Sequence, residues 1–282
     1  MFWGYALVVL AALLWSLIGP LTKFAIQGGM SPTEVAFWRA SLAWLAYVPQ
    51  GLAGRSLRVA PGDLPWLLLF GLVCVAGLFG SYGWAVRTGG AALASVLLYT
   101  APAWVALLAW KFLAEAMTPV KLAAVALTIA GVACVSLGHG LDGQLGLAAV
   151  GLGLLSGFIY SLYYIFGKFF LRRLSTPAIF SYALPVGALA MLPFTDFGHR
   201  SAEAWLACAV LALFSTYGAY TLYYAGLRRV EATRAAVTAT LEPVSANLLA
   251  FGLFGESFTP LGYFGAGLVL IAVLLTVLKG SR

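Results

Sequence analysis

Long apolar stretches dominate the chain, and short polar connectors separate them. A helix needs roughly 20 mostly apolar residues to cross a hydrocarbon core of about 30 Å, and ten stretches meet that requirement. These expected spans cover residues 3–26, 32–49, 64–86, 91–113, 119–137, 145–170, 177–194, 203–226, 232–254 and 259–278. The connectors are too short to hold a soluble domain. The pattern therefore predicts an all-α integral membrane protein of ten transmembrane helices.

The composition agrees with a lipid environment. Hydrophobic residues make up 62% of the 282 residues and charged residues only 9%, far below the roughly 25% charged residues of a soluble domain. The chain has 16 Lys and Arg against 9 Asp and Glu. This basic excess is better explained by membrane topology than by nucleic acid. We expect membrane lipid as a partner and no nucleic acid.

The basic residues predict an orientation, because Lys and Arg are retained on the cytoplasmic side. They concentrate after the even-numbered spans and after the last span, at Arg55, Arg58, Lys111, Lys121, Lys168, Arg172, Arg173, Arg228, Arg229, Arg234, Lys279 and Arg282. The other side receives Lys23, Arg87 and Arg200, while Arg39 lies inside a span. Both termini are expected to be cytoplasmic. Arg39 is near enough to the outer end to snorkel, and a cavity role stays open.

The second half of the chain resembles the first at an offset of about 141 to 145 residues. The clearest correspondence ties Pro102, Glu115, Thr118 and Pro119 to Pro243, Glu256, Thr259 and Pro260 at one constant offset. The sequence thus divides into two repeats, 1–140 and 141–282, with five spans each. Because five is odd, the repeats are expected to be inverted. Inverted repeats favour alternating access around a central cavity at the bilayer midplane.

Helix interruptions at corresponding places in the two repeats indicate where such a cavity lies. Pro102 and Pro243 form one such pair, and Gly19 with Pro20 interrupts the first span. Each proline of the pair frees a backbone carbonyl four residues earlier, which needs a new partner inside the protein. A packing kink is the alternative for each proline.

Polar side chains in lipid are costly, so those that share a helix face are expected to point into the bundle. The candidates for the substrate cavity are Trp15, Ser16, Tyr82, Tyr99, Ser161, Tyr164, Tyr217, Tyr220, Tyr224, Thr238, Glu242 and Ser245. Aromatic walls with hydroxyl edges suit a small zwitterion with an apolar side chain. The same faces are also suited to an organic cation.

Glu242 is the acidic residue expected near the middle of the membrane. An ionisable group there is a functional hypothesis by default. It has two open interpretations: it carries a proton in exchange for substrate, or it hydrogen-bonds the backbone freed beside Pro243.

The second half carries a recognisable pattern. Tyr223 is followed by Leu-Glu-Pro at 241–243, Gly-Glu at 255–256, Thr-Pro at 259–260 and an apolar last helix. Across its whole length the chain resembles EamA-type members of the drug/metabolite transporter superfamily, and its aromatic spans resemble those of YddG-type amino acid exporters. The resemblance implies export of small metabolites, often neutral or aromatic amino acids, across a bacterial inner membrane, by alternating access and without a cofactor. At the place that corresponds to Leu-Glu-Pro, the first half has Thr-Ala-Pro at 100–102, without an acidic residue. Any role that the resemblance implies for the acidic residue therefore applies only to Glu242.

Other classes of membrane protein are less consistent with the sequence. An enzyme needs clustered acids, bases or metal ligands, whereas His139, His199, Asp63, Asp142 and Asp196 are isolated in connectors. The three cysteines, Cys74, Cys134 and Cys208, lie in apolar stretches. We therefore predict no catalytic or metal site. A selective channel needs a ring of charged side chains or a run of filter carbonyls, and the sequence indicates neither. Export of organic cations or other drugs, and a non-transporting scaffold, remain alternatives, and the chain fits a monomer or a weak dimer.

Overall fold

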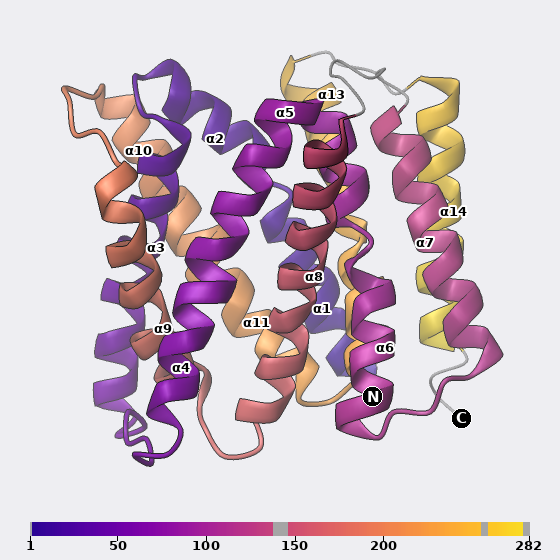
Figure 1. Cartoon of the computed structure of the whole chain (residues 1–282), viewed down its shortest axis with the longest axis horizontal. Coiled ribbons are helices and arrows are strands. Elements are labelled where there is room, and N and C mark those ends of the chain that lie inside the picture. The colour runs from indigo at the N-terminus through magenta and orange to yellow at the C-terminus, as the bar shows by residue number, and fades with distance from the viewer. Residues whose placement is uncertain (1, 138–145, 255–258, 279–282) are drawn as a thin grey trace.

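The structure of the protein, a computed structural model, describes residues 2–137, 146–254 and 259–278. Within these residues it is built from helices that run side by side between an upper and a lower edge (Figure 1). The first half contains α1 (Phe2–Trp15), α2 (Ile18–Gln27), α3 (Pro32–Ala53), α4 (Leu64–Phe70), the π-helical η1 (Gly71–Gly77), α5 (Leu78–Leu98), α6 (Ala101–Leu113) and α7 (Pro119–Leu137). The second half contains α8 (Leu147–Phe170), α9 (Thr176–Met191), the short η2 (Leu192–Phe194), α10 (Ala202–Val210), the π-helical η3 (Leu211–Gly218), α11 (Ala219–Leu227), α12 (Ala232–Ala239), α13 (Leu241–Phe254) and α14 (Pro260–Leu278).

Seven helical segments of the described residues are long and apolar enough to cross a membrane: Phe2–Gln27, Leu64–Leu98, Pro119–Leu137, Leu147–Phe170, Thr176–Phe194, Ala202–Leu227 and Pro260–Leu278. They make the chain a multi-pass membrane protein. Three expected spans do not qualify as single apolar helices. The span 32–49 lies in α3, which has the length but carries Glu34 and Arg39. The spans 91–113 and 232–254 are each divided between two helices.

Helix breaks lie next to the interruptions that the sequence predicts. Pro102 and Pro243 are buried and stand in the first turns of α6 and α13, directly after the breaks that end α5 and α12. The missing N–H of a proline costs little in a first turn. The prolines thus follow complete breaks instead of kinking continuous helices. Pro20 is buried and Gly19 exposed in the first turn of α2, where the first span is interrupted after α1.

The same kinds of contact occur in both halves. α1 packs on α11 and α5 packs on α8, while α3 packs on η3 and α9 on η1. Each π-helical segment stands at the corresponding place of its half, between α4 and α5 and between α10 and α11. α3 contacts α9, and α7 contacts α14. Glu256, the repeat partner of Glu115, lies outside the described residues.

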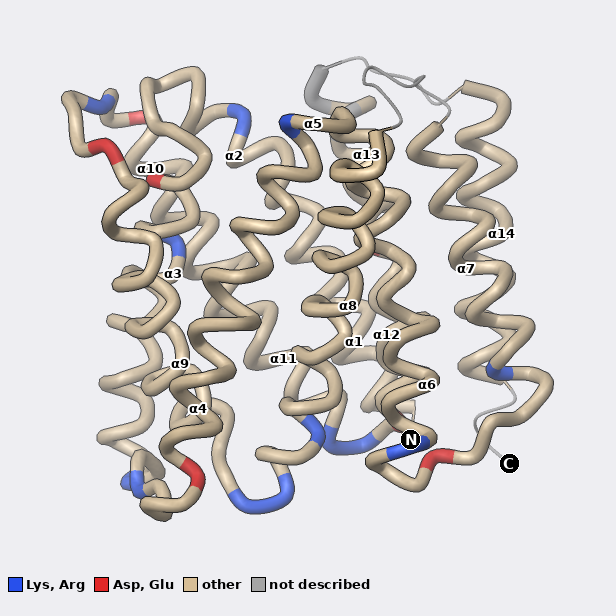
Figure 2. Tube along the Cα trace, viewed as in Figure 1, with Lys and Arg blue, Asp and Glu red and all other residues tan. Residues whose placement is uncertain are grey.

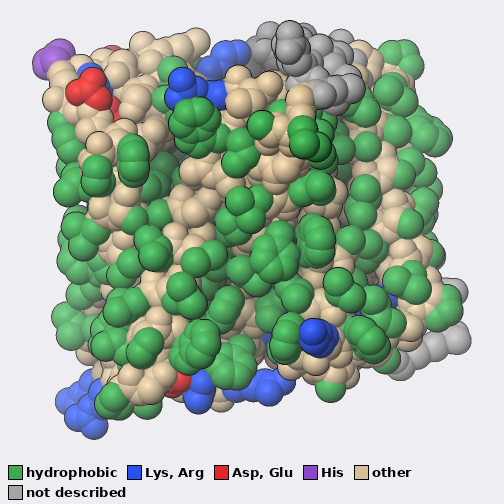
Figure 3. All heavy atoms as spheres, viewed as in Figure 1, with side chains coloured by type: hydrophobic (Ala, Val, Ile, Leu, Met, Phe, Trp, Pro, Cys, Tyr) green, Lys and Arg blue, Asp and Glu red, His purple; other side chains and the backbone are tan. Residues whose placement is uncertain are grey.

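The surface suits lipid. Hydrophobic side chains are spread over the whole face in Figure 3. Among the described residues, large apolar side chains such as Trp3, Leu206 and Phe264 are 75%, 67% and 61% exposed. Lys and Arg gather toward the two edges, most densely at the lower one, where α1 begins and α14 ends (Figure 2). Apolar flanks between charged edges are expected of a protein that uses lipid as its solvent.

Candidate functional site

Aromatic rings from both halves pack together where α1, α8 and α11 meet. The ring of Trp15 stands edge-on to Tyr220, with centroids 5.5 Å apart. Tyr220 in turn stacks on Tyr163, with centroids 5.6 Å apart and ring planes only 9° apart. We call this group the aromatic cluster; it comprises Trp15, Tyr160, Tyr163, Tyr164, Tyr220, Tyr223 and Tyr224. It joins the first half of the chain to the second.

Four of the predicted cavity residues belong to the aromatic cluster: Trp15, Tyr164, Tyr220 and Tyr224. Tyr217 points elsewhere. Its ring contacts Tyr47 of α3 at 4.8 Å, and the Tyr47 hydroxyl donates to the Tyr217 carbonyl at 3.0 Å. Tyr217 lies in η3, whose π-helical turns hold more residues than α-helical turns. The α-helical spacing that placed Tyr217 beside Tyr220 and Tyr224 therefore does not apply there.

Glu242 lies beside the aromatic cluster, in the first turn of α13, and is half-buried. The Tyr99 phenol lies near its carboxylate and interacts with it electrostatically. Tyr82 and Tyr164 also interact electrostatically with Glu242. The fold thus brings Tyr82, Tyr99 and Glu242 together from three separate expected spans. Tyr160, which the sequence analysis missed, faces Glu242 as well.

The predicted hydroxyl groups already have partners in their own helices. Ser16, Ser161 and Thr238 donate to backbone carbonyls three or four residues earlier, at 2.6, 2.6 and 2.8 Å. All three side chains are at most 1% exposed. Ser245 is half-buried on α13. The polar groups that remain beside the aromatic cluster are chiefly phenols, one carboxylate and one guanidinium.

That guanidinium belongs to Arg39, in the N-terminal half of α3. The interpretation that Arg39 snorkels is wrong, because the residue is only 9% exposed and its Nε donates to Thr216 Oγ1 at 2.6 Å. The guanidinium also lies 5.8 Å from the ring centre of Phe79. A small cavity of about 20 Å³ adjoins it, lined by Ala36, Arg39, Ala40, Val75, Phe79, Tyr163, Leu184, Thr216 and Tyr220. The sequence signal for this site was a charged residue inside an expected span.

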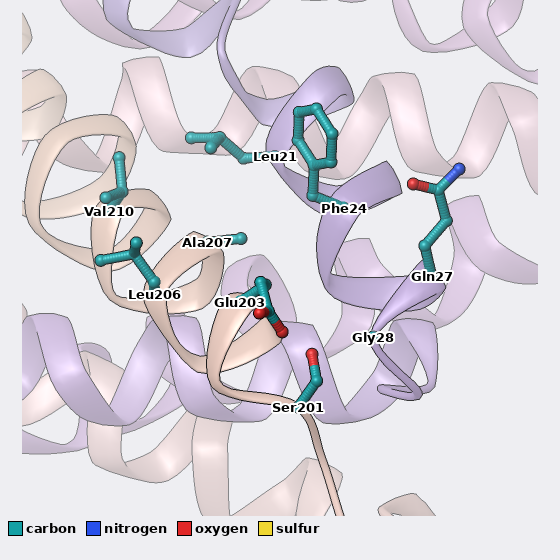
Figure 4. Close-up of a pocket in the computed structure, with 9 residues that line it drawn as sticks. All are labelled: Leu21, Phe24, Gln27, Gly28, Ser201, Glu203, Leu206, Ala207 and Val210. Carbon is teal, nitrogen blue, oxygen red and sulfur yellow. The ribbon is translucent and has the colours of Figure 1, made fainter.

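A larger pocket of about 460 Å³ opens between α2 and α10 (Figure 4). Its walls are mostly apolar, and the Ser201 hydroxyl and the Glu203 carboxylate lie near each other at one end. Ser201 Oγ accepts the backbone N–H of Ala204 and so caps α10. None of the residues that line this pocket belongs to the aromatic cluster. It is a site apart from the one the sequence predicts.

Charged residues close the lower edge beneath the aromatic cluster. Lys121 Nζ binds Glu231 Oε1 at 2.9 Å, and Arg234 Nε binds Glu231 Oε2 at 2.5 Å. Lys168 Nζ donates to the backbone carbonyls of Leu227 and Val230 at 2.5 and 2.6 Å. We call this group, together with Glu115, the lower-edge network. It ties α7, α8 and the connector after α6 to the start of α12.

Glu231 is the half-exposed acid of this network. Burial alone would raise its pKa, but hydrogen bonds and charges from Lys121 and Arg234 hold the pKa below its usual value of 4.5. Glu231 therefore remains ionised, and its ion pairs persist at neutral pH.

Within the described residues, no three His, Cys, Asp or Glu side chains gather as metal ligands would. His139 and Asp142, two of the isolated connector residues, lie outside the described residues.

Comparisons with known proteins place this arrangement among membrane transporters. The EamA-like transporter family model matches the chain twice, over residues 2–137 and 147–278. A protein of Archaeoglobus fulgidus named an uncharacterized transporter is 29% identical over 97% of this chain and 96% of its own length. A protein of Salmonella typhimurium named the uncharacterized inner membrane transporter YicL is 26% identical over 99% of this chain and 96% of its own length.

Two further comparisons bear on substrate and fold. A protein of Streptantibioticus cattleyicolor named a probable terminal-alkyne amino-acid exporter is 25% identical over 95% of this chain and 91% of its own length. One solved crystal structure superposes with a TM-score of 0.86 over 99% of this chain and 98% of that one, at 19% identity. At that identity the superposition establishes the shared fold.

Proposed function

We propose a function from one premise: this chain belongs to the EamA-like transporter family, within the drug/metabolite transporters. The general activity is transport across a membrane. We propose that the solutes are amino acids with neutral or aromatic side chains, and that the protein exports them. The observation that carries this proposal is the aromatic cluster, built by both halves of the chain and flanked by Glu242 and Arg39.

The chemistry of the cluster supports an amino acid. Stacked and edge-on rings such as Tyr163, Tyr220 and Trp15 give an apolar surface for a side chain. Opposite charges at Glu242 and Arg39 suit a zwitterion. The name of the Streptantibioticus cattleyicolor relative points to the same class of solute.

Alternating access is the proposed mechanism. We propose ten spans arranged as two inverted repeats, 1–140 and 141–282. The matching contacts of the halves support this arrangement, as does Figure 1, in which α1 begins at the lower edge and α8 at the upper edge. The lower-edge network would hold one side closed, and breaking its ion pairs would open that side. Inverted repeats supply the two alternative states.

We further propose that the lower edge faces the cytoplasm of a bacterial cell, with the inner membrane around the protein. The density of Lys and Arg at that edge supports this orientation (Figure 2). Both termini would then be cytoplasmic. The largely apolar flanks fit a monomer or a weak dimer in lipid, with a small-molecule substrate and no cofactor.

An exporter of organic cations is the second candidate. Tyrosines around one carboxylate, Glu242, are the recognition chemistry of cation sites. Arg39 argues against it, because a buried guanidinium repels a cation. A scaffold role has no specific observation in its favour.

Uptake into liposomes tests the proposed function. Purified protein is reconstituted, and labelled amino acids and organic cations are offered with and without a pH gradient. We expect saturable amino acid uptake that Tyr220→Ala or Tyr224→Ala reduces at least tenfold. Tyr263→Ala, at a tyrosine that is 59% exposed on α14, is the matched control. Preference for cations would favour the second candidate, and folded protein that moves no solute would favour a scaffold.

A further inference from the structure

Arg39 is a buried charge for which the fold supplies little compensation. A guanidinium has five N–H donors and stays protonated in proteins. The Arg39 Nε donates to the Thr216 hydroxyl, which is a neutral group. In the part of the chain that the structure describes, no ion pair joins Arg39 to a carboxylate. Glu34, one helical turn earlier on α3, is held by Arg200 at 2.7 Å.

An unpaired charge at this depth is costly, and proteins retain such groups where they pair with one another or with a substrate. The cavity of about 20 Å³ beside Arg39 holds about one water molecule. Two rings of the aromatic cluster, Tyr163 and Tyr220, form part of its wall. The guanidinium thus borders the surface on which the proposed solute would rest.

Glu242 completes the arrangement. It interacts electrostatically with Arg39 but forms no ion pair with it in the described structure. A positive and a negative group therefore flank the aromatic cluster without cancelling each other. The two ends of an α-amino acid carry the complementary charges.

We infer that Arg39 binds the carboxylate of the transported solute, with the ammonium group directed toward Glu242 and the side chain against Tyr163 and Tyr220. This inference rests on the proposed function and names the residue that recognises the carboxylate of the amino acid. Arginine suits the task because its planar fork donates two parallel hydrogen bonds to a carboxylate. The cavity must widen to admit the solute, and the opening step of alternating access provides that widening.

Four related probes test the inference: L-phenylalanine, L-phenylalaninamide, phenethylamine and 3-phenylpropionate. Their binding to purified full-length protein is measured as a thermal shift and confirmed by competition with labelled phenylalanine. The wild type should prefer phenylalanine to its amide. Arg39→Gln should weaken phenylalanine binding about 10- to 100-fold, the worth of a charge-assisted hydrogen bond or two. The same variant should leave binding of the amide unchanged or improved, and Arg39→Lys should fall between.

Two further variants separate binding from structural support. Thr216→Val removes the hydroxyl that accepts the Arg39 Nε–H and leaves the guanidinium in place, so discrimination between acid and amide should persist. Arg87→Gln, at an exposed arginine of α5 that lies over Trp84, should change nothing. Equal losses of acid and amide binding in Arg39→Gln would overturn the inference and assign Arg39 to structural support. A wild type that binds neither phenylalanine nor 3-phenylpropionate would instead overturn the proposed function and the inference with it.

Discussion

The carboxylate of Glu115 accepts hydrogen bonds from both the backbone N–H and the hydroxyl of Thr233, at 3.2 and 2.9 Å. It also accepts a hydrogen bond from the backbone N–H of Ala232 at 2.5 Å. Glu115 follows α6, and Ala114 turns the chain there in the left-handed region, at φ 58°. The connector of the first half therefore caps the N-terminus of α12 in the second half. A carboxylate at that position also interacts favourably with the helix dipole.

Removing this cap should destabilise the protein. Glu115→Ala leaves the buried N–H groups of Ala232 and Thr233 without their acceptor, which costs about 1 to 3 kcal/mol. Glu115→Gln keeps one acceptor oxygen and should cost less. The midpoint of thermal unfolding in detergent measures both effects. Asp196→Asn, at an exposed acid in the connector before α10, is the control, and an unchanged midpoint in Glu115→Ala would refute the capping role.

Acid should weaken the lower-edge network. Lys121 and Arg234 lower the pKa of Glu231 in the folded protein, so their contribution to stability is complete above the usual value of 4.5. It is lost as the pH falls below 4.5 and through the lowered pKa of the folded state, where Glu231 takes up a proton. As the pH is lowered from about 7 to about 3.5, the unfolding midpoint should therefore fall less for Glu231→Gln than for the wild type. Parallel curves below pH 4.5 would contradict this assignment.

Close packing of α7 on α14 gives a prediction that involves no charge. A Cβ added at Gly265 would lie 2.4 Å from the Gly131 carbonyl oxygen, a backbone atom that cannot move aside. Small residues permit such approaches between membrane helices. Gly265→Ala should therefore lower stability by about 1 to 3 kcal/mol, again read from the unfolding midpoint. Gly267→Ala, where an added Cβ meets no atom within 4 Å, should not; equal midpoints for the two variants would show that α7 and α14 adjust freely.

These sites differ in how far the sequence reveals them. Apolar runs predict most spans, because lipid requires them, and the prolines at 102 and 243 mark real helix breaks. Helical spacing predicts that Tyr220 and Tyr224 share a face of one helix, and their ring centroids lie 6.3 Å apart on α11. The Tyr217 ring instead contacts Tyr47, because the π-helical segment η3 changes the spacing and has no plain sequence signal. Spacing alone relates residues on one helix and leaves their neighbours on other helices undetermined.

Arg39 and Glu115 show the other limit. Arg39 stood out as a charge inside an expected span, but its burial depends on Thr216, 177 residues away in the chain. The Glu115 cap joins residues 118 apart. Such partners come from the fold as a whole. The repeat pattern marks Glu115 as notable without saying what it binds.

Glu242 still has two interpretations, and one variant separates them. If Glu242 carries the proton that is exchanged for solute, Glu242→Gln should keep counterflow exchange of labelled amino acid across liposomes, at a higher solute concentration because the neutral amide attracts the ammonium group less. The same variant should lose the stimulation of uptake by a pH gradient, since an amide cannot bind and release a proton at working pH.

If Glu242 instead serves the first turn of α13, its negative charge stabilises the helix N-terminus by about 0.3 to 1 kcal/mol. Glu242→Gln should then lower the unfolding midpoint slightly. The effect of the pH gradient on uptake should be the same in the variant and in the wild type, whether or not the gradient stimulates uptake. Asp196→Asn, at an exposed acid in the connector before α10, reports any general effect of removing a negative charge. The proton is assigned to Glu242 if only Glu242→Gln loses the dependence of uptake on the pH gradient while counterflow is retained. A purely structural carboxylate would affect uptake and counterflow alike.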